Sequence, residues 1–132
     1  MLLAYAPLEI RQKVLKASMA SFNERTVTDP VKLENILGQI VKTGENESCG
    51  DLDSGGYSIA AAIRDANGET TAALSIAGYI ADLDEVRRAL HWKLVREGTR
   101  EISEHLGWSV ANREYASPKF NYSSSFMGLS PK

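Results

Sequence analysis

Residues Tyr57 to Tyr79 form two short apolar runs separated by Asp65-Ala66-Asn67-Gly68. Two β-prone runs joined by Asn-Gly are the strongest short-range signal for a β-hairpin, because Asn and Gly adopt the backbone conformations that a tight turn requires. We therefore expect two antiparallel strands here, against which the rest of the chain must pack.

Side-chain size is distributed unevenly in these strands, whose successive residues point to opposite sides. In the first strand the larger set is Tyr57, Ile59, Ala61 and Ile63, and the smaller set is Ser58, Ala60, Ala62 and Arg64. In the second strand, Thr70, Ala72, Leu74 and Ile76 alternate with Thr71, Ala73, Ser75 and Ala77. A turn loop of two or four residues places both small sets on one face, whereas a three-residue loop mixes them. We expect the even loop, because it separates large side chains from small ones.

A face of Ala, Ser and Thr can serve two purposes. A helix can lie close against small residues, or a small molecule can occupy the shallow space that they leave. The residues alone favour the packing surface over the ligand site.

Length and charge exclude several classes of protein. The chain has 132 residues, which is enough for one domain, and its net charge of −2 argues against nucleic-acid binding by this piece alone. No apolar run approaches the roughly 20 residues that span a membrane, and the start lacks the basic leader of a signal peptide. The single Cys49 cannot form an internal disulfide, so we expect a reducing, cytoplasmic setting.

Three helices are predicted from apolar periodicity and capping residues. The first covers Leu8 to about Phe22. The second covers Val31 to Thr43, after the capping sequence Thr28-Asp29-Pro30, and ends at Gly44. The third runs from Leu83 to about Leu106, with Asp82 as its N-cap, Glu85 in a capping box and an apolar line of Val86, Leu90, Leu94, Ile102 and Leu106.

The segment Glu45 to Gly56 has the composition of a loop, and its Asp51 and Asp53 do not match a calcium-binding loop.

His91 and His105 are too far apart to bind one metal ion. Trp92 is either an interface anchor or a core residue. Residues 108–132 differ in composition from the rest, and we expect a tail that is partly ordered or packed on a partner.

No phosphate-binding loop, nucleophile elbow or metal-binding motif occurs in the chain. We therefore expect no enzyme activity, no cofactor and no metal.

Three motifs and the order of the elements resemble the effector-binding domain of the IclR family of bacterial transcriptional regulators. The motifs are LLAYAPLEIRQKVL from Leu2, TVTDPVKLENILGQIVKTG from Thr26, and DLDSGGYSIAAAIRDANGETTAALSIAGY from Asp51. EISEHLG from Glu101 is similar to the end of the family's closing helix. The resemblance covers Leu2 to about Gly107, and the third motif is its most specific part.

The resemblance implies an α/β (α+β) domain of GAF-like fold over residues 1–107, with an antiparallel sheet flanked by helices. It implies a small-molecule effector, often a carboxylate or an aromatic metabolite, and a homodimer or homotetramer. DNA binding is expected only through an N-terminal winged helix-turn-helix that this chain lacks. The opening strands of the effector domain are also expected to lie upstream of Leu2, which would leave the sheet incomplete.

The ligand positions of the family fall on the small side chains of the hairpin. Ser58 and Ser75 correspond to positions that hydrogen-bond the ligand, and Ala60 and Ala73 belong to the same predicted ligand-binding set. Ala77 stands where many members have a second Ser, and Ser48 stands where an acidic residue is common, so a hydroxyl and a charge are lost. These differences favour a larger or less polar effector.

Two other functions remain open from the sequence. The domain could be an assembly module in which the small face only accommodates a helix or a partner's tail. It could also be a small enzyme of GAF-like fold that uses Cys49, although no partner for that thiol is apparent.

Overall fold

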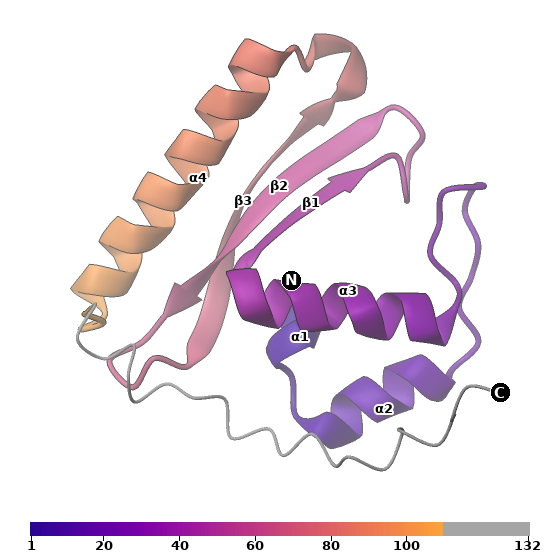
Figure 1. Cartoon of the computed structure of the whole chain (residues 1–132), viewed down its shortest axis with the longest axis horizontal. Coiled ribbons are helices and arrows are strands. Elements are labelled where there is room, and N and C mark those ends of the chain that lie inside the picture. The colour runs from indigo at the N-terminus through magenta and orange to yellow at the C-terminus, as the bar shows by residue number, and fades with distance from the viewer. Residues whose placement is uncertain (110–132) are drawn as a thin grey trace, which may run out of the picture.

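The computed structural model describes residues 1–109 and has the expected α+β architecture (Figure 1). Three helices, α1 (Leu2–Tyr5), α2 (Leu8–Lys16) and α3 (Pro30–Thr43), precede three strands, β1 (Glu45–Cys49), β2 (Gly56–Arg64) and β3 (Thr70–Tyr79). A 3-10 turn (Ile80–Asp82) leads into the long helix α4 (Glu85–His105). Apart from Trp108 and Ser109, the predicted tail lies outside the described residues.

The three strands form one antiparallel sheet in the order β1-β2-β3. The prediction of a loop from Glu45 onward is wrong for its first five residues, which are β1. This segment is polar because β1 lies at the edge of the sheet, where a strand needs no apolar run and where charged side chains hinder pairing with other chains. Composition therefore could not distinguish it from a loop.

The hairpin reaches the expected arrangement of faces by an unexpected route. Asp65 and Glu69 pair across the turn (N···O 3.0 Å), which leaves an odd loop of Ala66, Asn67 and Gly68. The prediction of an even loop is therefore wrong. One extra residue, Thr71, bulges out of β3, because Arg64 pairs with Thr70 whereas Ile63 pairs with Ala72. The bulge restores the pairing that keeps large and small residues apart.

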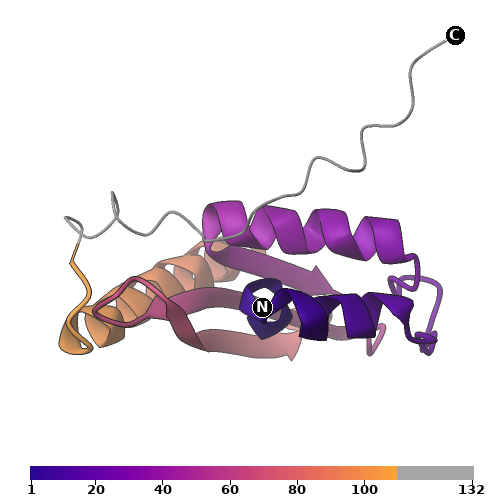
Figure 2. The ribbon, with the colours of Figure 1, turned by 90° about the horizontal axis from the view of Figure 1, so that it is seen from below.

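Helix α4 lies along the strands and covers the face with the larger residues (Figures 1 and 2). Tyr57, Ile59 and Ala61 of β2 pack with Val95 of α4, and Ile59 and Val95 have no exposed surface. Full burial of one such side chain contributes about 1.5–3 kcal/mol. Gly98 lets the helix approach closely, since a Cβ atom there would lie 2.7 Å from Cδ2 of Leu74.

Two predictions about α4 are wrong in detail. Its N-cap is Asp84, whose carboxylate accepts from the Arg87 N–H (2.7 Å), and not Asp82, which belongs to the 3-10 turn. The residues facing the sheet are Val95, Thr99 and Ser103, which are buried. The expected apolar line is exposed instead: Val86, Leu90, Leu94, Ile102 and Leu106. The small side chains of Thr99 and Ser103, together with Gly98, permit a close approach of the helix to the sheet.

Helices α1, α2 and α3 gather beside one end of the sheet (Figures 1 and 2). Helix α3 begins and ends as expected: the Asp29 carboxylate caps it, and Gly44 ends it with φ of 74°. Leu37 and Ile40 of α3 pack with Ala4 of α1 in a second small core.

Helix α2 is shorter than predicted and ends at Lys16 rather than near Phe22. The residues that follow bond to one another: the N–H groups of Phe22 and Asn23 both donate to Oγ1 of Thr26 (3.1 and 3.0 Å). Such side-chain bonds compete with helical ones. Arg11 of α2 is buried, and its Nη2 lies 3.7 Å from Oε1 of Glu34 in α3. Within residues 1–109, no helix has both the length and the apolar character needed to cross a bilayer.

Candidate functional site

The register of the sheet brings together the six residues that were predicted to bind a ligand. Ser48, Ser58 and Ala77 form one row across the three strands, and Asn46, Ala60 and Ser75 form the next. Ala62 and Ala73 form a third row. Paired residues in a sheet lie on the same face. We call this face the small-residue floor, and it consists of Asn46, Ser48, Ser58, Ala60, Ala62, Ala73, Ser75 and Ala77.

The small-residue floor is the face of the sheet opposite α4. Ser75 and Ala77 are exposed, and Ser58, Ala60 and Ala73 are half-buried. Within residues 1–109, no other group uses the hydroxyl of Ser58 or Ser75. The floor therefore combines methyl groups, which favour apolar ligand surface, with two hydroxyls that can donate to or accept from a ligand.

A carboxylate stands at one corner of the floor. The Ser48 hydroxyl donates to Oδ1 of Asp51. Asp51 belongs to the loop between β1 and β2, which two side chains from the α2–α3 connection hold in place. Nδ2 of Asn23 donates to the Gly50 carbonyl (2.9 Å), and Oγ1 of Thr26 donates to the Asp51 carbonyl (2.7 Å). Ser48 itself carries no charge, but Asp51 supplies one beside it.

Sequence reasoning missed Asn46 and Asp51 as members of this site. Asn46 was missed because its segment was assigned to a loop, although it lies two residues before Ser48 and alternation would have placed both on one face. Asp51 was considered only as a metal ligand. No sequence signal links it to Ser48, because the contact depends on how the loop after β1 turns back.

The residues with reactive side chains lie on the other face or outside the site. The Tyr57 hydroxyl and Nδ1 of His91 are 2.8 Å apart on the α4 side, and Nδ1 of His105 lies 2.8 Å from the Glu101 carbonyl. Cys49 is an exposed free thiol at the end of β1. Within residues 1–109, no three His, Cys, Asp or Glu side chains gather as a metal site.

Trp92 packs against the core between α4 and the sheet. Of the two predicted roles, interface anchor or core residue, this position agrees with the second. The guanidinium of Arg96 lies 4.8 Å from the centre of its ring. Arg96 also binds the Glu45 carboxylate through two contacts of 2.7 Å, and Arg88 binds Glu47 in the same way (2.8 and 2.5 Å). These two ion pairs join α4 to β1. The hydrogen bonds from Arg88 hold the pKa of Glu47 below its ordinary value.

Comparison with known proteins places the chain in a family. The sequence model described as "Bacterial transcriptional regulator IclR C-terminal" matches residues 1–104. The transcriptional regulator BhcR of Paracoccus denitrificans is 32% identical over 103 residues, which are 77% of this chain and 37% of that protein. KipR of Bacillus subtilis is 28% identical over 109 residues, which are 82% of this chain and 44% of that protein.

Solved structures give the same result. The C-terminal domain of the Escherichia coli regulator KdgR aligns with a TM-score of 0.69 at 27% identity, over 81% of this chain and 66% of that chain. An IclR homolog from Microbacterium hydrocarbonoxydans complexed with 4-hydroxybenzoate aligns with a TM-score of 0.69 at 30% identity, over 80% of this chain and 42% of that chain.

The chain therefore belongs to the family of C-terminal domains of IclR-type bacterial transcriptional regulators. It spans less than half the length of the curated relatives named above. Those relatives are named as transcriptional regulators and not as enzymes, which agrees with the expectation that this domain has no catalytic role.

Proposed function

We propose that this domain senses a small-molecule effector on the small-residue floor and passes the signal to a DNA-binding domain. The observation that carries the proposal is the alignment of Ser58, Ala60, Ser75 and their neighbours in rows across all three strands. The short side chains of these residues leave a shallow space on the sheet. The hydroxyls of Ser58 and Ser75, which no other group within residues 1–109 uses, supply specificity.

The preferred effector is a metabolite with an aromatic or otherwise apolar body. A methyl group replaces the second hydroxyl at Ala77, and Asp51 disfavours a negative charge near Ser48. An aromatic ring lying over Ala60 and Ala73, with a polar substituent at Ser58 or Ser75, fits these features. The relative that was solved with 4-hydroxybenzoate supports this class of ligand.

The regulatory mechanism follows from linkage. A ligand shifts an equilibrium only by its difference in affinity between two states, which is typically about 1–3 kcal/mol in allosteric proteins.

The full-length regulator is proposed to bind DNA in the cytoplasm as a homodimer or homotetramer. The exposed apolar line on α4 favours association between copies, and it also supports the assembly role as a second function of the domain.

The test is calorimetric titration of the chain with 4-hydroxybenzoate and, in parallel, a thermal-shift screen against a metabolite library. For the compound that binds, the double variant Ser58→Ala/Ser75→Ala is expected to weaken binding by roughly ten-fold, because two hydrogen bonds are lost. Ser54→Ala, at an exposed loop serine, is the matched control and should not change the affinity. If Ser58→Ala/Ser75→Ala binds the compound as tightly as Ser54→Ala does, the small-residue floor is rejected as the binding site.

A further inference from the structure

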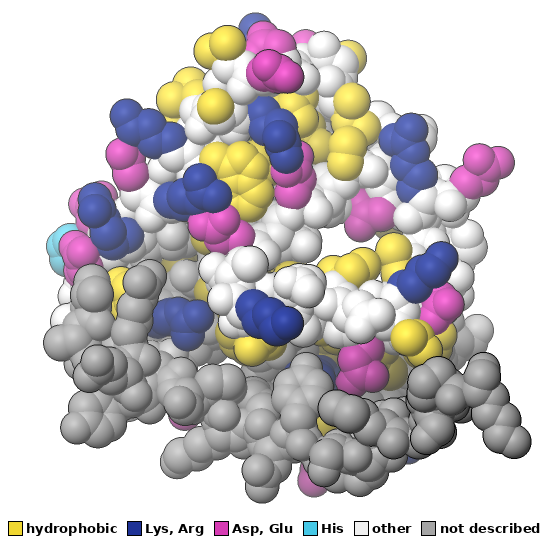
Figure 3. Space-filling model, viewed as in Figure 1, with side chains coloured by type: hydrophobic (Ala, Val, Ile, Leu, Met, Phe, Trp, Pro, Cys, Tyr) yellow, Lys and Arg dark blue, Asp and Glu magenta, His cyan; other side chains and the backbone are white. Residues whose placement is uncertain are grey.

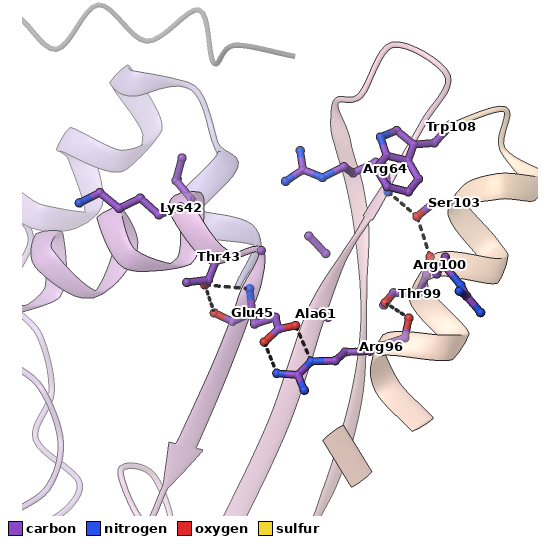
Figure 4. A pocket seen from close by; sticks show the side chains of 13 residues that line it. Lys42, Thr43, Glu45, Ala61, Arg64, Arg96, Thr99, Arg100, Ser103 and Trp108 are labelled. Atoms are coloured by element: carbon purple, nitrogen blue, oxygen red, sulfur yellow. Dashed lines mark hydrogen bonds and ion pairs between the residues drawn. The ribbon is translucent and has the colours of Figure 1, made fainter. Parts of the chain in front are cut away.

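A concave site lies at the end of the small-residue floor, with which it shares Ala62. A cavity of about 660 Å³ opens between the C-terminal end of α3 and the second half of α4 (Figure 4). Its volume falls within the range of small-molecule sites in proteins. None of the residues of the predicted ligand-binding set lines it. Figure 3 shows the same face of the molecule, with dark-blue Lys and Arg side chains over α4 and α3.

Positive charge predominates among the residues that line this cavity. Arg64 of β2, Arg96 and Arg100 of α4, and Lys42 of α3 contribute cations, and among the described residues that line the cavity Glu45 is the only one with a carboxylate. Arg96 binds that carboxylate through two contacts of 2.7 Å and so neutralises it. Arg64, in contrast, has no ion pair among the described residues.

Arg64 is held so that it faces the cavity. Its Nη1 donates to the Gly68 carbonyl (3.0 Å), its guanidinium lies 5.8 Å from the ring centre of Tyr5, and its backbone N–H donates to Oγ of Ser103 (3.0 Å). Figure 4 shows the guanidinium reaching into the space beside α3. A guanidinium has five N–H donors, and the Gly68 carbonyl accepts from only one nitrogen.

A second unsatisfied donor stands at the same end of the cavity. Nε1 of Trp108 is buried and has no hydrogen-bond partner among the described residues. A buried N–H without an acceptor costs about 1–3 kcal/mol, and native proteins rarely leave one unpaired. In Figure 4, Trp108 lies beside Arg64 and Ser103. The Ser103 hydroxyl cannot serve as donor to a ligand, because it already donates to the Thr99 carbonyl (2.6 Å).

Two carbonyl groups near the end of α3 are already hydrogen-bonded. The C-terminal carbonyls of a helix carry partial negative charge. In α3 the Ile40 carbonyl accepts from the Tyr5 hydroxyl (2.9 Å) and the Gly44 N–H (2.8 Å), and the Gly44 carbonyl accepts from the Ala62 N–H (2.8 Å).

We propose that this cavity binds a small organic oxyanion, a carboxylate or a phosphate monoester, whose anionic group lies between the Arg64 guanidinium and the Trp108 indole N–H. The body of the ligand extends toward Ala61 and Val41, the apolar part of the wall. The site shares only Ala62 with the small-residue floor, and it gives the domain a second ligand-binding surface.

The two tryptophans make this site observable in the full chain. We suggest titrating the protein with benzoate and with phenyl phosphate while following the indole N–H resonances by NMR, with Trp108→Phe identifying the signal of Trp108. The Trp108 resonance should shift to saturation. Benzamide is a neutral molecule of the same shape as benzoate. Its affinity should be lower than that of benzoate by roughly ten-fold or by a larger factor. Binding of phenyl phosphate alone would assign the site to phosphate esters, and binding of benzoate alone to carboxylates, each supporting an oxyanion site.

Substitutions separate this site from the floor. Arg64→Gln and Trp108→Phe are expected to weaken oxyanion binding, measured by calorimetry, by roughly ten-fold each. Arg87→Gln, at an exposed arginine near the start of α4, and Ser58→Ala/Ser75→Ala on the floor should both leave it unchanged. Equal affinity for benzoate and benzamide, or unchanged affinity in both Arg64→Gln and Trp108→Phe, would overturn the proposal. Loss of binding in the floor variant would assign the anion to the floor instead.

Discussion

A small set of residues in this domain fixes the fold, and a larger set does not. Ile59 lies at the centre of the sheet, fully buried against α4, whereas Val86 on the same helix is 79% exposed. Both are β-branched aliphatic residues. The sequence pattern placed Ile59 in the larger set of its strand and Val86 on the apolar line of its helix. Burial, and not residue type, therefore decides how much each contributes to stability.

Ile59→Ala is expected to lower the free energy of unfolding by about 2–5 kcal/mol, because it removes buried methyl groups and leaves a cavity beside Val95. Val86→Ala is the matched control, with an expected change within about 0.5 kcal/mol. Urea denaturation followed by circular dichroism measures both. Similar losses for the two variants would mean that α4 presents a different face to the sheet.

At the scale of elements, the contact between α4 and β1 depends on charge. Glu45 and Glu47 are two residues apart on β1 and point to the α4 side, where Arg96 and Arg88 bind them. These ion pairs explain how a polar edge strand is held in the sheet. Because the side chains of Arg88 and Arg96 are about half exposed, water and salt weaken both pairs.

The Glu47 pair gives a pH dependence with a definite sign. The hydrogen bonds from Arg88 lower the pKa of Glu47 from its ordinary value of 4.5. The resulting stabilisation is present above pH 4.5 and is lost as the pH falls through the lower pKa of the folded state. Glu47→Gln should therefore lower the thermal midpoint at neutral pH, and the difference from the unchanged protein should shrink in acid.

Thermal melts between neutral pH and about pH 3 measure this effect. Glu24→Gln is the control, since Glu24 is an exposed residue with no ion pair among the described residues. A difference between Glu47→Gln and the unchanged protein that stays constant down to the lowest pH would contradict the assigned ion pair.

The elements differ in how far the sequence predicts them. The hairpin and α3 were predictable because local residues fix them: Asn67-Gly68 turns the chain, and Asp29 and Gly44 begin and end the helix. Strand β1 was not predictable, because its place in the sheet comes from pairing with β2 and its ion pairs with α4. The same is true of Asp51, whose position depends on Asn23 and Thr26 from a distant loop.

At the scale of the whole molecule, the exposed line on α4 is the feature that the fold of one chain leaves unexplained. Leu90, Leu94 and Leu106 are each close to half exposed. Large apolar side chains exposed together on one helix favour a contact with another surface. We expect a second copy of the chain to cover it.

Sedimentation velocity over a range of protein concentrations should accordingly show reversible self-association. Leu94→Lys is expected to shift the equilibrium toward the monomer, because association would then bury an unpaired charge. Leu52→Lys is the matched control, since Leu52 is an exposed leucine in the β1–β2 loop. If both variants associate like the unchanged protein, the contact lies elsewhere.

The bulge at Thr71 has a consequence for comparing this domain with related sequences. Thr71 is the one residue of β3 that has no pairing partner in β2. A chain that lacks this residue could therefore pair regularly and keep the same residues on the floor. Length differences between relatives should then be tolerated at this point. An alignment gap belongs beside Thr71 and not within Ala72–Tyr79, where it would exchange the inner and outer side chains of the strand.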